Sequence, residues 1–262
     1  MLFLLNKIRR KLLTDNKVTS YLFYAIGEIL LVVIGILIAV SIDNWNDARV
    51  KQEEGIEYRK RLIGNLFTDN QNISKRISFF NQVYAFGKSA ESHLRAGYSS
   101  NPIDQWKFVI EAYQVSQIWP IRTTITTYNE LQNNGALQYL AEDSILQMVS
   151  SYYLDHSEQL SQINEGTTTY REFIRGAVPL KVQHYMWGNC FELRDLDNQQ
   201  FKPCDLPIEF QTDISQVYSR IFEDPHFKDM LTRRVITLYV RNSLLADMLE
   251  TNNRLLTSLK SS

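Results

Sequence analysis

Residues 21–46 read YLFYAIGEILLVVIGILIAVSIDNWN, and the first 22 of them form an apolar stretch with one charged residue, Glu28. A helix over those 22 residues is about 33 Å long at about 1.5 Å per residue, which is enough to cross the hydrocarbon core of a bilayer. Tyr21 and Tyr24 lie at one end and Trp45 at the other, as aromatic residues do at membrane interfaces. The stretch therefore predicts a single transmembrane helix with the lipid bilayer as its partner.

The basic residues around the span predict its orientation. Residues 1–20 carry a net charge of +4, whereas residues 43–262 carry −4. Five basic residues lie within about 15 positions before the span, and only Arg49 and Lys51 lie in a comparable window after it. Because the flank richer in Lys and Arg stays inside, we expect a basic cytoplasmic segment (1–20), a transmembrane helix (21–42) and an extracytoplasmic domain (43–262).

The first 13 residues, MLFLLNKIRRKLL, combine apolar side chains at helical spacing with basic ones. Such a helix can lie on an anionic leaflet, with its apolar face buried and its basic face near the lipid phosphates. We assign four basic residues to the membrane interface: Lys7, Arg9, Arg10 and Lys11. The alternative is that they act only as the flank that sets the orientation of the span.

A cleaved signal peptide is an alternative interpretation of the span. Residues 29–42 have the length of a signal-peptide apolar region, and Ala39-Val40-Ser41 resembles a small-x-small cleavage site. Against cleavage, the whole hydrophobic stretch is long for such a region, and 20 residues precede it.

Four residues of the span lie on one helical face and are candidates for helix packing: Ala25, Glu28, Gly35 and Ala39. Gly35 and Ala39 form a small-xxx-small pair that permits close approach of a second helix. A carboxylate at the depth of Glu28 is costly unless it faces protein or water. Three roles stay open for it: a protonated or hydrated side chain near the cytoplasmic edge, helix association, and movement of protons or ions.

The segment YAIGEILLVVIGILIAVSIDNWN at residues 24–46 resembles the N-terminal signature of an uncharacterised family of Gram-negative bacterial membrane proteins, known as a domain of unknown function. A second element, Tyr128-Asn129-Glu130-Leu131 followed by Gly135, resembles a Y-x-E-L-x-x-x-G pattern midway along such chains. The resemblance implies a single-span protein of the bacterial inner membrane with a helical periplasmic region. It implies no catalytic residues.

The rest of the chain predicts an all-α fold, an elongated helical bundle with long antiparallel helices. Only 10 glycines and 6 prolines occur in 262 residues, which provides few of the turns that sandwiches and Rossmann folds need. Apolar positions alternate in steps of three and four from Ile56 to Tyr84 through Asn70, and again from Leu231 to Leu259. We expect helices over these ranges: 46–96, 102–117, 127–135, 142–176 and 224–260. Asn101 with Pro102, and Thr127 with Glu130, are the predicted capping pairs.

Motifs for catalysis or metal binding are absent from the sequence. His93, His156, His184 and His226 have no metal-ligand spacing, and we expect His156 to be a structural residue. No nucleotide-binding loop, nucleophile elbow or zinc-protease motif occurs, and residues 195–198 lack the glycine and glutamate of a calcium loop. We therefore expect no enzyme activity and no cofactor. The net charge of −1 gives no reason to expect nucleic acid as a partner.

Cys190 and Cys204 are the two cysteines of the chain and share one polar connector. Outside the cytoplasm they can pair, and closing a loop of about 15 residues contributes about 3 kcal/mol in the chain-entropy model. We expect a disulfide. Two free thiols, or a nucleophilic pair of Cys190 with His184, are the alternatives.

Two classes of function follow. The first is a non-enzymatic scaffold or interaction module that forms homo-oligomers or binds another membrane protein. The second is the extracytoplasmic sensing or gating subunit of a transport or signalling assembly. We favour the first, because a sensor working alone needs an output domain that about 20 cytoplasmic residues cannot form. No small-molecule ligand is identifiable from the sequence.

Overall fold

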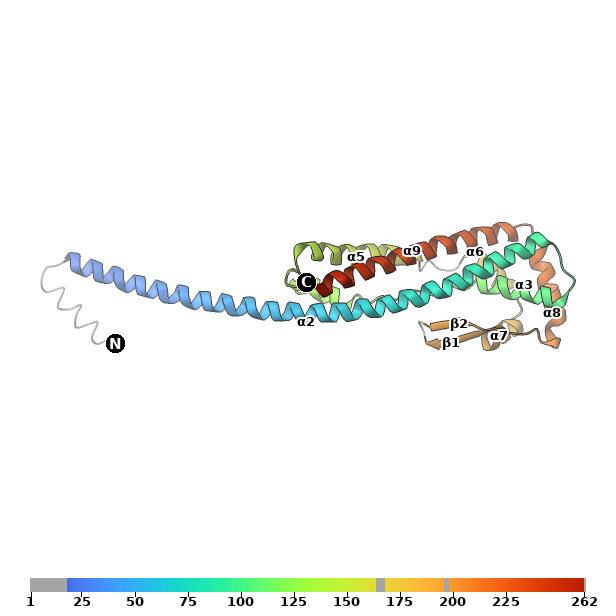
Figure 1. The fold of residues 1–262 in the computed structure, drawn as a ribbon, viewed down its shortest axis with the longest axis horizontal. Coiled ribbons are helices and arrows are strands. Elements are labelled where there is room, and N and C mark those ends of the chain that lie inside the picture. Colours follow the sequence, from blue (N-terminus) through green and yellow to red (C-terminus); the bar gives the residue numbers. More distant parts are fainter. Residues whose placement is uncertain (1–17, 164–167, 196–197, 262) are drawn as a thin grey trace. The chain divides into compact units, whose positions relative to one another are not determined.

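The computed structural model describes residues 18–163, 168–195 and 198–261, with backbone alone at 18–20, 156–163 and 195. These residues are mostly helical, so the predicted all-α class is confirmed (Figure 1). The chain divides into two compact units at the Ile56–Glu57 peptide bond. The described part of the first unit is helical throughout, and the second unit contains the bundle.

Helix α2 (Val18–Ala96) joins the predicted span and the predicted long helix in one element. In the second unit its buried positions other than Phe79 alternate in steps of four and three: Leu62, Leu66, Asp69, Ile73, Arg76, Phe80, Val83, Gly87 and Ala90. The sequence predicted Asn70 and Ile77 on this line, but both are half-buried beside it. Asp69 and Arg76, one position earlier, occupy the line instead. The predicted line is therefore shifted by one residue at these two places, while Leu66, Ile73 and Phe80 lie on it as predicted.

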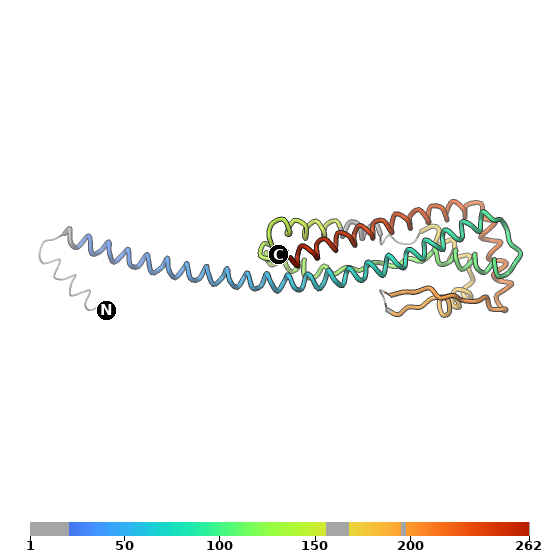
Figure 2. The backbone as a smooth tube through the Cα atoms, in the orientation of Figure 1, coloured from blue at the N-terminus to red at the C-terminus, as the bar shows by residue number. Residues whose placement is uncertain are grey.

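Helix α9 (Phe227–Ser261) runs antiparallel to α2 in the second unit, as predicted. The ring of Tyr84 lies 6.3 Å from that of Tyr239. Asn70, which is earlier in α2, is hydrogen-bonded to Asn252, which is later in α9, so the two helices run in opposite directions. Figure 2 shows the same return of the chain along α2. The buried face of α9 keeps the four-and-three alternation and includes two arginines: Phe227, Leu231, Arg234, Leu238, Arg241, Leu245, Met248, Asn252, Leu255 and Leu259.

Helix α4 (Thr126–Asn133) begins one residue before the predicted cap, and its N-cap makes no side-chain hydrogen bond. The predicted capping box is therefore wrong. The hydroxyl of Thr127 instead accepts from the amide of Asn65, 2.7 Å away, and Glu130 pairs with Arg61 at 2.7 Å. Both partners lie on α2, so these side chains dock α4 rather than cap it. The 3₁₀ helix η1 (Ala136–Tyr139) follows a left-handed glycine at φ 63°, which agrees with the predicted helix stop at that residue.

The single helix predicted over residues 142–176 is wrong. The structure has α5 (Asp143–Ile163) and a separate α6 (Thr169–Ala177). Thr168 is extended, and its hydroxyl accepts from the backbone N–H of Arg171 over 3.2 Å. A capped helix start at this point divides the segment in two.

The connector between α6 and α9 contains structure that the sequence did not predict. Its elements are α7 (Leu180–Asn189), β1 (Phe191–Asp195), β2 (Asn198–Phe201), η2 (Ile208–Phe210) and α8 (Gln211–Phe222). The strands form an antiparallel hairpin in which Phe191 pairs with Phe201. The hairpin contacts α2, because the rings of Phe79 and Phe201 stack with centroids 5.0 Å apart. It is the one sheet among the described residues.

The second unit has two apolar cores along α2 and α9. The smaller core joins the start of this part of α2 to α4, α5 and the end of α9, through residues such as Leu66, Tyr152 and Leu259. The larger core joins the end of α2 to α3 (Pro102–Val115), α6, α7 and α8. Burial of these side chains is the main force that holds the bundle together. The larger core supports the cleft described next.

Candidate functional site

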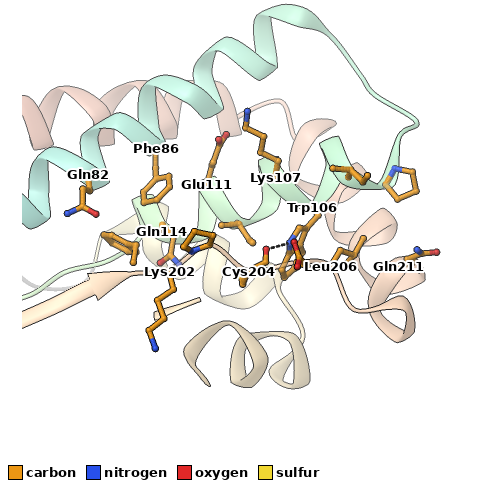
Figure 3. A pocket seen from close by; sticks show the side chains of 16 residues that line it. Gln82, Phe86, Trp106, Lys107, Glu111, Gln114, Lys202, Cys204, Leu206 and Gln211 are labelled. Carbon is orange, nitrogen blue, oxygen red and sulfur yellow. Dashed lines mark hydrogen bonds between the residues drawn. The ribbon is translucent and has the colours of Figure 1, made fainter. Parts of the chain in front are cut away.

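A cleft of about 810 Å³ lies in the second unit between α2, α3 and residues 201–206, which we call the strap (Figure 3). Its lining is mixed, with apolar, amide and charged side chains: Gln82, Phe86, Pro102, Ile103, Trp106, Lys107, Ile110, Glu111, Gln114, Phe201, Lys202, Pro203, Cys204, Asp205, Leu206 and Gln211. Ligand sites in proteins commonly have this size and this combination of apolar walls with a few polar groups. We call it the α3 cleft.

Helix α3 is held at both ends. At its start the side chain of Asn101 accepts from the N–H of Ile103 over 2.9 Å, which confirms the predicted N-cap, and Pro102 occupies the first turn. At its end Arg171 donates to the carbonyl of Ser116 at 2.6 Å, and Arg234 donates to the carbonyl of Val115 at 3.0 Å. Guanidinium groups are favourable there, because the carboxyl end of a helix carries partial negative charge. The helix therefore offers a fixed wall.

Aromatic rings form the apolar part of the cleft. Phe86 meets Phe201 edge to face, with ring centroids 5.0 Å apart and planes at 80°. Phe201 also stacks on Phe79 of α2, and Trp106 is only 4% exposed. Edge-to-face and stacked pairs fix ring positions better than aliphatic contacts do. The apolar wall is thus formed before any ligand binds.

The strap is attached to its surroundings by covalent and hydrogen bonds. Cys204 forms a disulfide with Cys190, with Cα atoms 5.0 Å apart. The N–H of Lys202 donates to the carbonyl of Cys190 over 2.9 Å, and the indole N–H of Trp106 donates to the carbonyl of Cys204 over 3.1 Å. The last of these bonds is drawn in Figure 3. Cys204 therefore lines the cleft, and its bond to Cys190 ties the strap to the end of α7.

Glu111 is the buried charged residue of the cleft and is 6% exposed. Its carboxylate turns toward α2, where the hydroxyl of Ser89 donates to Oε1 over 2.7 Å. Oε2 is shielded from solvent and has no hydrogen-bond partner among the described residues. Burial raises the pKa of Glu111, while the Ser89 hydrogen bond and the charge of Lys107 act against that rise. A buried acceptor without a donor is costly, and titratable groups with displaced pKa values concentrate at functional sites.

The other charged residues of the cleft are Lys107, Lys202 and Asp205, and all three are exposed. No ion pair within 4.0 Å joins Lys107 or Lys202 to Glu111 in the described part of the chain. Lys202 approaches Glu192 of the hairpin at 3.8 Å, where its side chain is 46% exposed. The lysines are solvated, and Glu111 is the desolvated charge.

The residues predicted for membrane contact lie elsewhere, in the first unit. Ala25, Glu28, Gly35 and Ala39 are all in α2, and no atom comes within 4 Å of a Cβ built on Gly35. The most apolar 18-residue window of this helix is 0% buried, so the described residues leave the span uncovered. Trp45 is 68% exposed. Tyr21 and Tyr24 are half-buried in the same helix.

The basic interface residues predicted from the sequence lie outside the described residues, and the structure says nothing of them: Lys7, Arg9, Arg10 and Lys11. The side chain of His156 is likewise outside the described ones. His93 lies 3.2 Å from the hydroxyl of Tyr218, and burial lowers its pKa. Among the described residues no group of three or more His, Cys, Asp or Glu side chains is arranged to hold a metal ion.

The sequence did not predict the α3 cleft. Glu111 follows Lys107 by one turn in the run WKFVIEAYQV, a spacing typical of a solvent-facing helix surface, so its burial has no local signal. The partners that complete the cleft, Ser89 and Phe201, come from distant parts of the chain and have no local signal.

Comparisons with known proteins cover part of the chain. A model described as a family of unknown function (DUF6090) matches residues 28–91. No curated protein and no solved structure matches. The match contains most of the apolar stretch and most of the second-unit part of α2, including Phe86 and Ser89, but neither α3 nor the strap. Over α2 the chain is thus similar to an uncharacterised family.

Proposed function

We propose that this protein is a non-enzymatic helical interaction module anchored in a membrane by a single span. The observation that carries the proposal is the apolar surface of residues 21–42, which the described residues leave uncovered in α2. In water this surface would be a large exposed apolar patch, whereas in a bilayer it is solvated by lipid. The bundle that follows is the part available for interactions.

The orientation follows from the charges that flank the span. The excess of basic residues before residue 21 supports a cytoplasmic N-terminus and an extracytoplasmic bundle. The inner-membrane and periplasmic locations are proposed from the family resemblance of residues 24–46. The disulfide between Cys190 and Cys204 fits this orientation, because structural disulfides persist in oxidising compartments.

The span is also the proposed surface for self-association. Ala25, Glu28, Gly35 and Ala39 share a helical face, and the space beside Gly35 is open. Small residues let two helix backbones approach, and a carboxylate between two helices can be hydrogen-bonded rather than exposed to lipid. The partner is a second copy of this chain or another membrane protein.

Membrane fractionation tests the anchor. The full chain is expected in the membrane fraction and resistant to carbonate extraction, and a chain lacking residues 21–42 is expected in the soluble fraction. Fusions after Ser262 test the orientation: alkaline phosphatase should be active and a cytoplasm-dependent fluorescent protein should be dark. Recovery of the full chain in the soluble fraction would contradict the anchor, and the opposite reporter result would contradict the orientation alone.

A second candidate function, the sensing subunit of a larger assembly, is favoured by the α3 cleft. A preformed cleft of about 810 Å³ with one buried, half-satisfied carboxylate is more than a bundle needs for packing. The test is whether the cleft binds a ligand.

A further inference from the structure

We propose that the α3 cleft binds a small apolar molecule with a primary amine, and that the ammonium group donates to Oε2 of Glu111. The inference deepens the sensing function proposed above by naming the class of ligand. It rests on the unpartnered carboxylate oxygen, the aromatic wall and the contrast between buried and exposed charges.

The polar group that the cleft lacks is a hydrogen-bond donor to Glu111. Ser89 satisfies Oε1 of Glu111, and Oε2 is left without a donor among the described residues. Oε2 is also shielded from solvent, so the proposal requires the Glu111 side chain to turn toward the cleft when the ammonium binds. An ammonium supplies both a hydrogen bond and the opposite charge, which compensates a buried carboxylate better than a neutral donor does. Burial raises the pKa of Glu111, although the Ser89 hydrogen bond and the charge of Lys107 act against that rise.

The apolar walls of the cleft favour a ligand whose uncharged part is apolar. Phe86, Trp106, Ile110 and Phe201 present aromatic and aliphatic surface from α2, α3 and the end of β2. Removing apolar ligand surface from water is the main source of affinity in such a site. A ligand that carries its charge at one end can place that end at Glu111 and its body along these rings.

An apolar carboxylate is the alternative that the lysines suggest. Lys107 and Lys202 are exposed, so an ion pair with them remains in water and contributes little. Glu111 is desolvated, so an ion pair with its carboxylate changes ligand affinity more than an ion pair with an exposed lysine does. The amine is therefore preferred over the acid.

The test uses the full chain in lipid nanodiscs, with empty nanodiscs subtracted. Three probes of nearly equal shape are titrated by calorimetry: 2-phenylethylamine, 2-phenylethanol and phenylacetate. Hexylamine is added as an aliphatic amine. At pH 7.5 we expect at least one amine to bind at least tenfold more tightly than both the alcohol and the acid. Equal affinities, preference for the acid, or no binding of either amine at millimolar concentration would overturn the proposal.

Variants identify the residue. Glu111→Gln keeps the size of the side chain and is expected to reduce amine affinity at least tenfold, to the level of the alcohol. Glu130→Gln is the matched control, because Glu130 pairs with Arg61 outside the cleft, and it should bind like the unmodified protein. Lys107→Gln removes a competing cation and should tighten amine binding a few-fold. Unchanged amine affinity in a folded Glu111→Gln protein refutes the proposal.

Two outcomes need separation. If Glu111→Gln does not fold, as judged by circular dichroism, the relative affinities of amine and alcohol for the unmodified protein still decide whether the cleft prefers an amine. Amine binding by a chain that fractionates as soluble would refute the anchor and leave the cleft proposal intact. A chain that is membrane-bound but binds no amine would refute the cleft proposal and leave the anchor intact.

Discussion

Asn70 and Asn252 are 182 residues apart in the sequence, and the amide of Asn70 donates to Oδ1 of Asn252 over 3.2 Å. Asn252 is fully buried in the α9 row. Its own amide donates to the carbonyl of Leu66 at 3.1 Å and to the hydroxyl of Tyr152 at 2.9 Å. One side chain thereby links α2, α5 and α9. A buried polar residue of this kind fixes the register of packed helices.

Replacing Asn252 by Ala should destabilise the bundle by about 2 kcal/mol. The substitution leaves the buried hydroxyl of Tyr152 and the amide of Asn70 with fewer partners, and unsatisfied buried groups cost about 1–3 kcal/mol. Thermal unfolding followed by circular dichroism measures the change. Asn253→Ala is the control: Asn253 is exposed and accepts from Asn70 at 2.6 Å, so a loss below about 0.5 kcal/mol is expected. Equal losses in both variants would contradict the role of Asn252.

Asp69 should make stability depend on pH. It is fully buried, and burial raises its pKa from 3.8 to about 6, although the N–H of Thr124 donates to its carboxylate at 2.9 Å. The folded protein therefore binds a proton more readily than the unfolded chain, so the free energy of unfolding rises as pH falls from above 6 to below 3.8. Asp69→Asn keeps the acceptor and removes the charge. It should stabilise the protein at pH 8 by up to about 3 kcal/mol.

Urea unfolding at pH 4.5, 6 and 8 measures this effect. The difference between Asp69→Asn and the unmodified protein should shrink toward low pH, since the carboxyl is then protonated in the folded state, and it should vanish only below 3.8, where the unfolded chain is protonated as well. An exposed acid, Asp143→Asn, provides the control and should show no such trend. A destabilised Asp69→Asn protein at pH 8 would mean that the negative charge itself is required.

The helices could be predicted from the sequence, but the residues on their buried faces could be predicted only in part. Helices α2, α3 and α9 and their antiparallel order follow from apolar spacing, the Asn101 cap and the scarcity of proline. The charged and polar members of the buried rows do not follow. Asp69 is accepted in the core because Thr124 donates to it, and Arg234 because helix-end carbonyls accept from it. These partners are 55 and 119 residues away.

The hairpin and the cleft were missed for a related reason. β2 reads NQQF, which lacks the β-branched residues that indicate a strand. Its stability comes from the disulfide next to it and from the stack of Phe201 on Phe79. Local sequence carries no record of such partners, so Glu111 appeared as one more helical glutamate.

Gly87 should tolerate no side chain, whereas Gly64 should benefit from one. A Cβ at Gly87 would lie 2.6 Å from Cγ2 of Val235, and Val is stiff at χ1. A Cβ at Gly64 meets no atom within 4 Å. Gly64→Ala should therefore stabilise α2 by up to about 1 kcal/mol, the difference in helix propensity. Gly87→Ala should instead destabilise the protein by about 1–3 kcal/mol, because the added methyl group collides with Val235. Adding Val235→Ala to Gly87→Ala should remove this collision and recover the lost stability.

Thermal unfolding of the single and double variants measures these differences. If Gly87→Ala and Gly64→Ala raise the melting temperature equally, α9 is not closely packed against α2 at Val235.

Gly35→Leu and Ala39→Leu should weaken self-association of the span. Larger side chains keep two helix backbones apart, and the small pair is what permits close approach. Chemical cross-linking in mild detergent measures the dimer fraction. Leu37→Ala is the control, because Leu37 is exposed and lies two residues from both Gly35 and Ala39, on the opposite side of the helix. Unchanged yields in both Leu variants would remove this face as an oligomer interface.

The disulfide provides a prediction that joins the fold to the orientation. In protein recovered without reductant, trypsin cleaves after Arg194 and separates the two cysteines, so mass spectrometry should find residues around Cys190 and Cys204 as one linked peptide pair. Replacing both by Ser should cost about 3 kcal/mol, because the bond closes a loop of about 15 residues in the unfolded chain. The double variant should also weaken amine binding, since Cys204 holds the strap beside Trp106. Free thiols in protein exposed to the periplasm would refute the bridge. Thiols that react only with reagents applied from the cytoplasmic side would instead refute the orientation, because the basic flank and the two cysteines would then lie on the same side of the membrane.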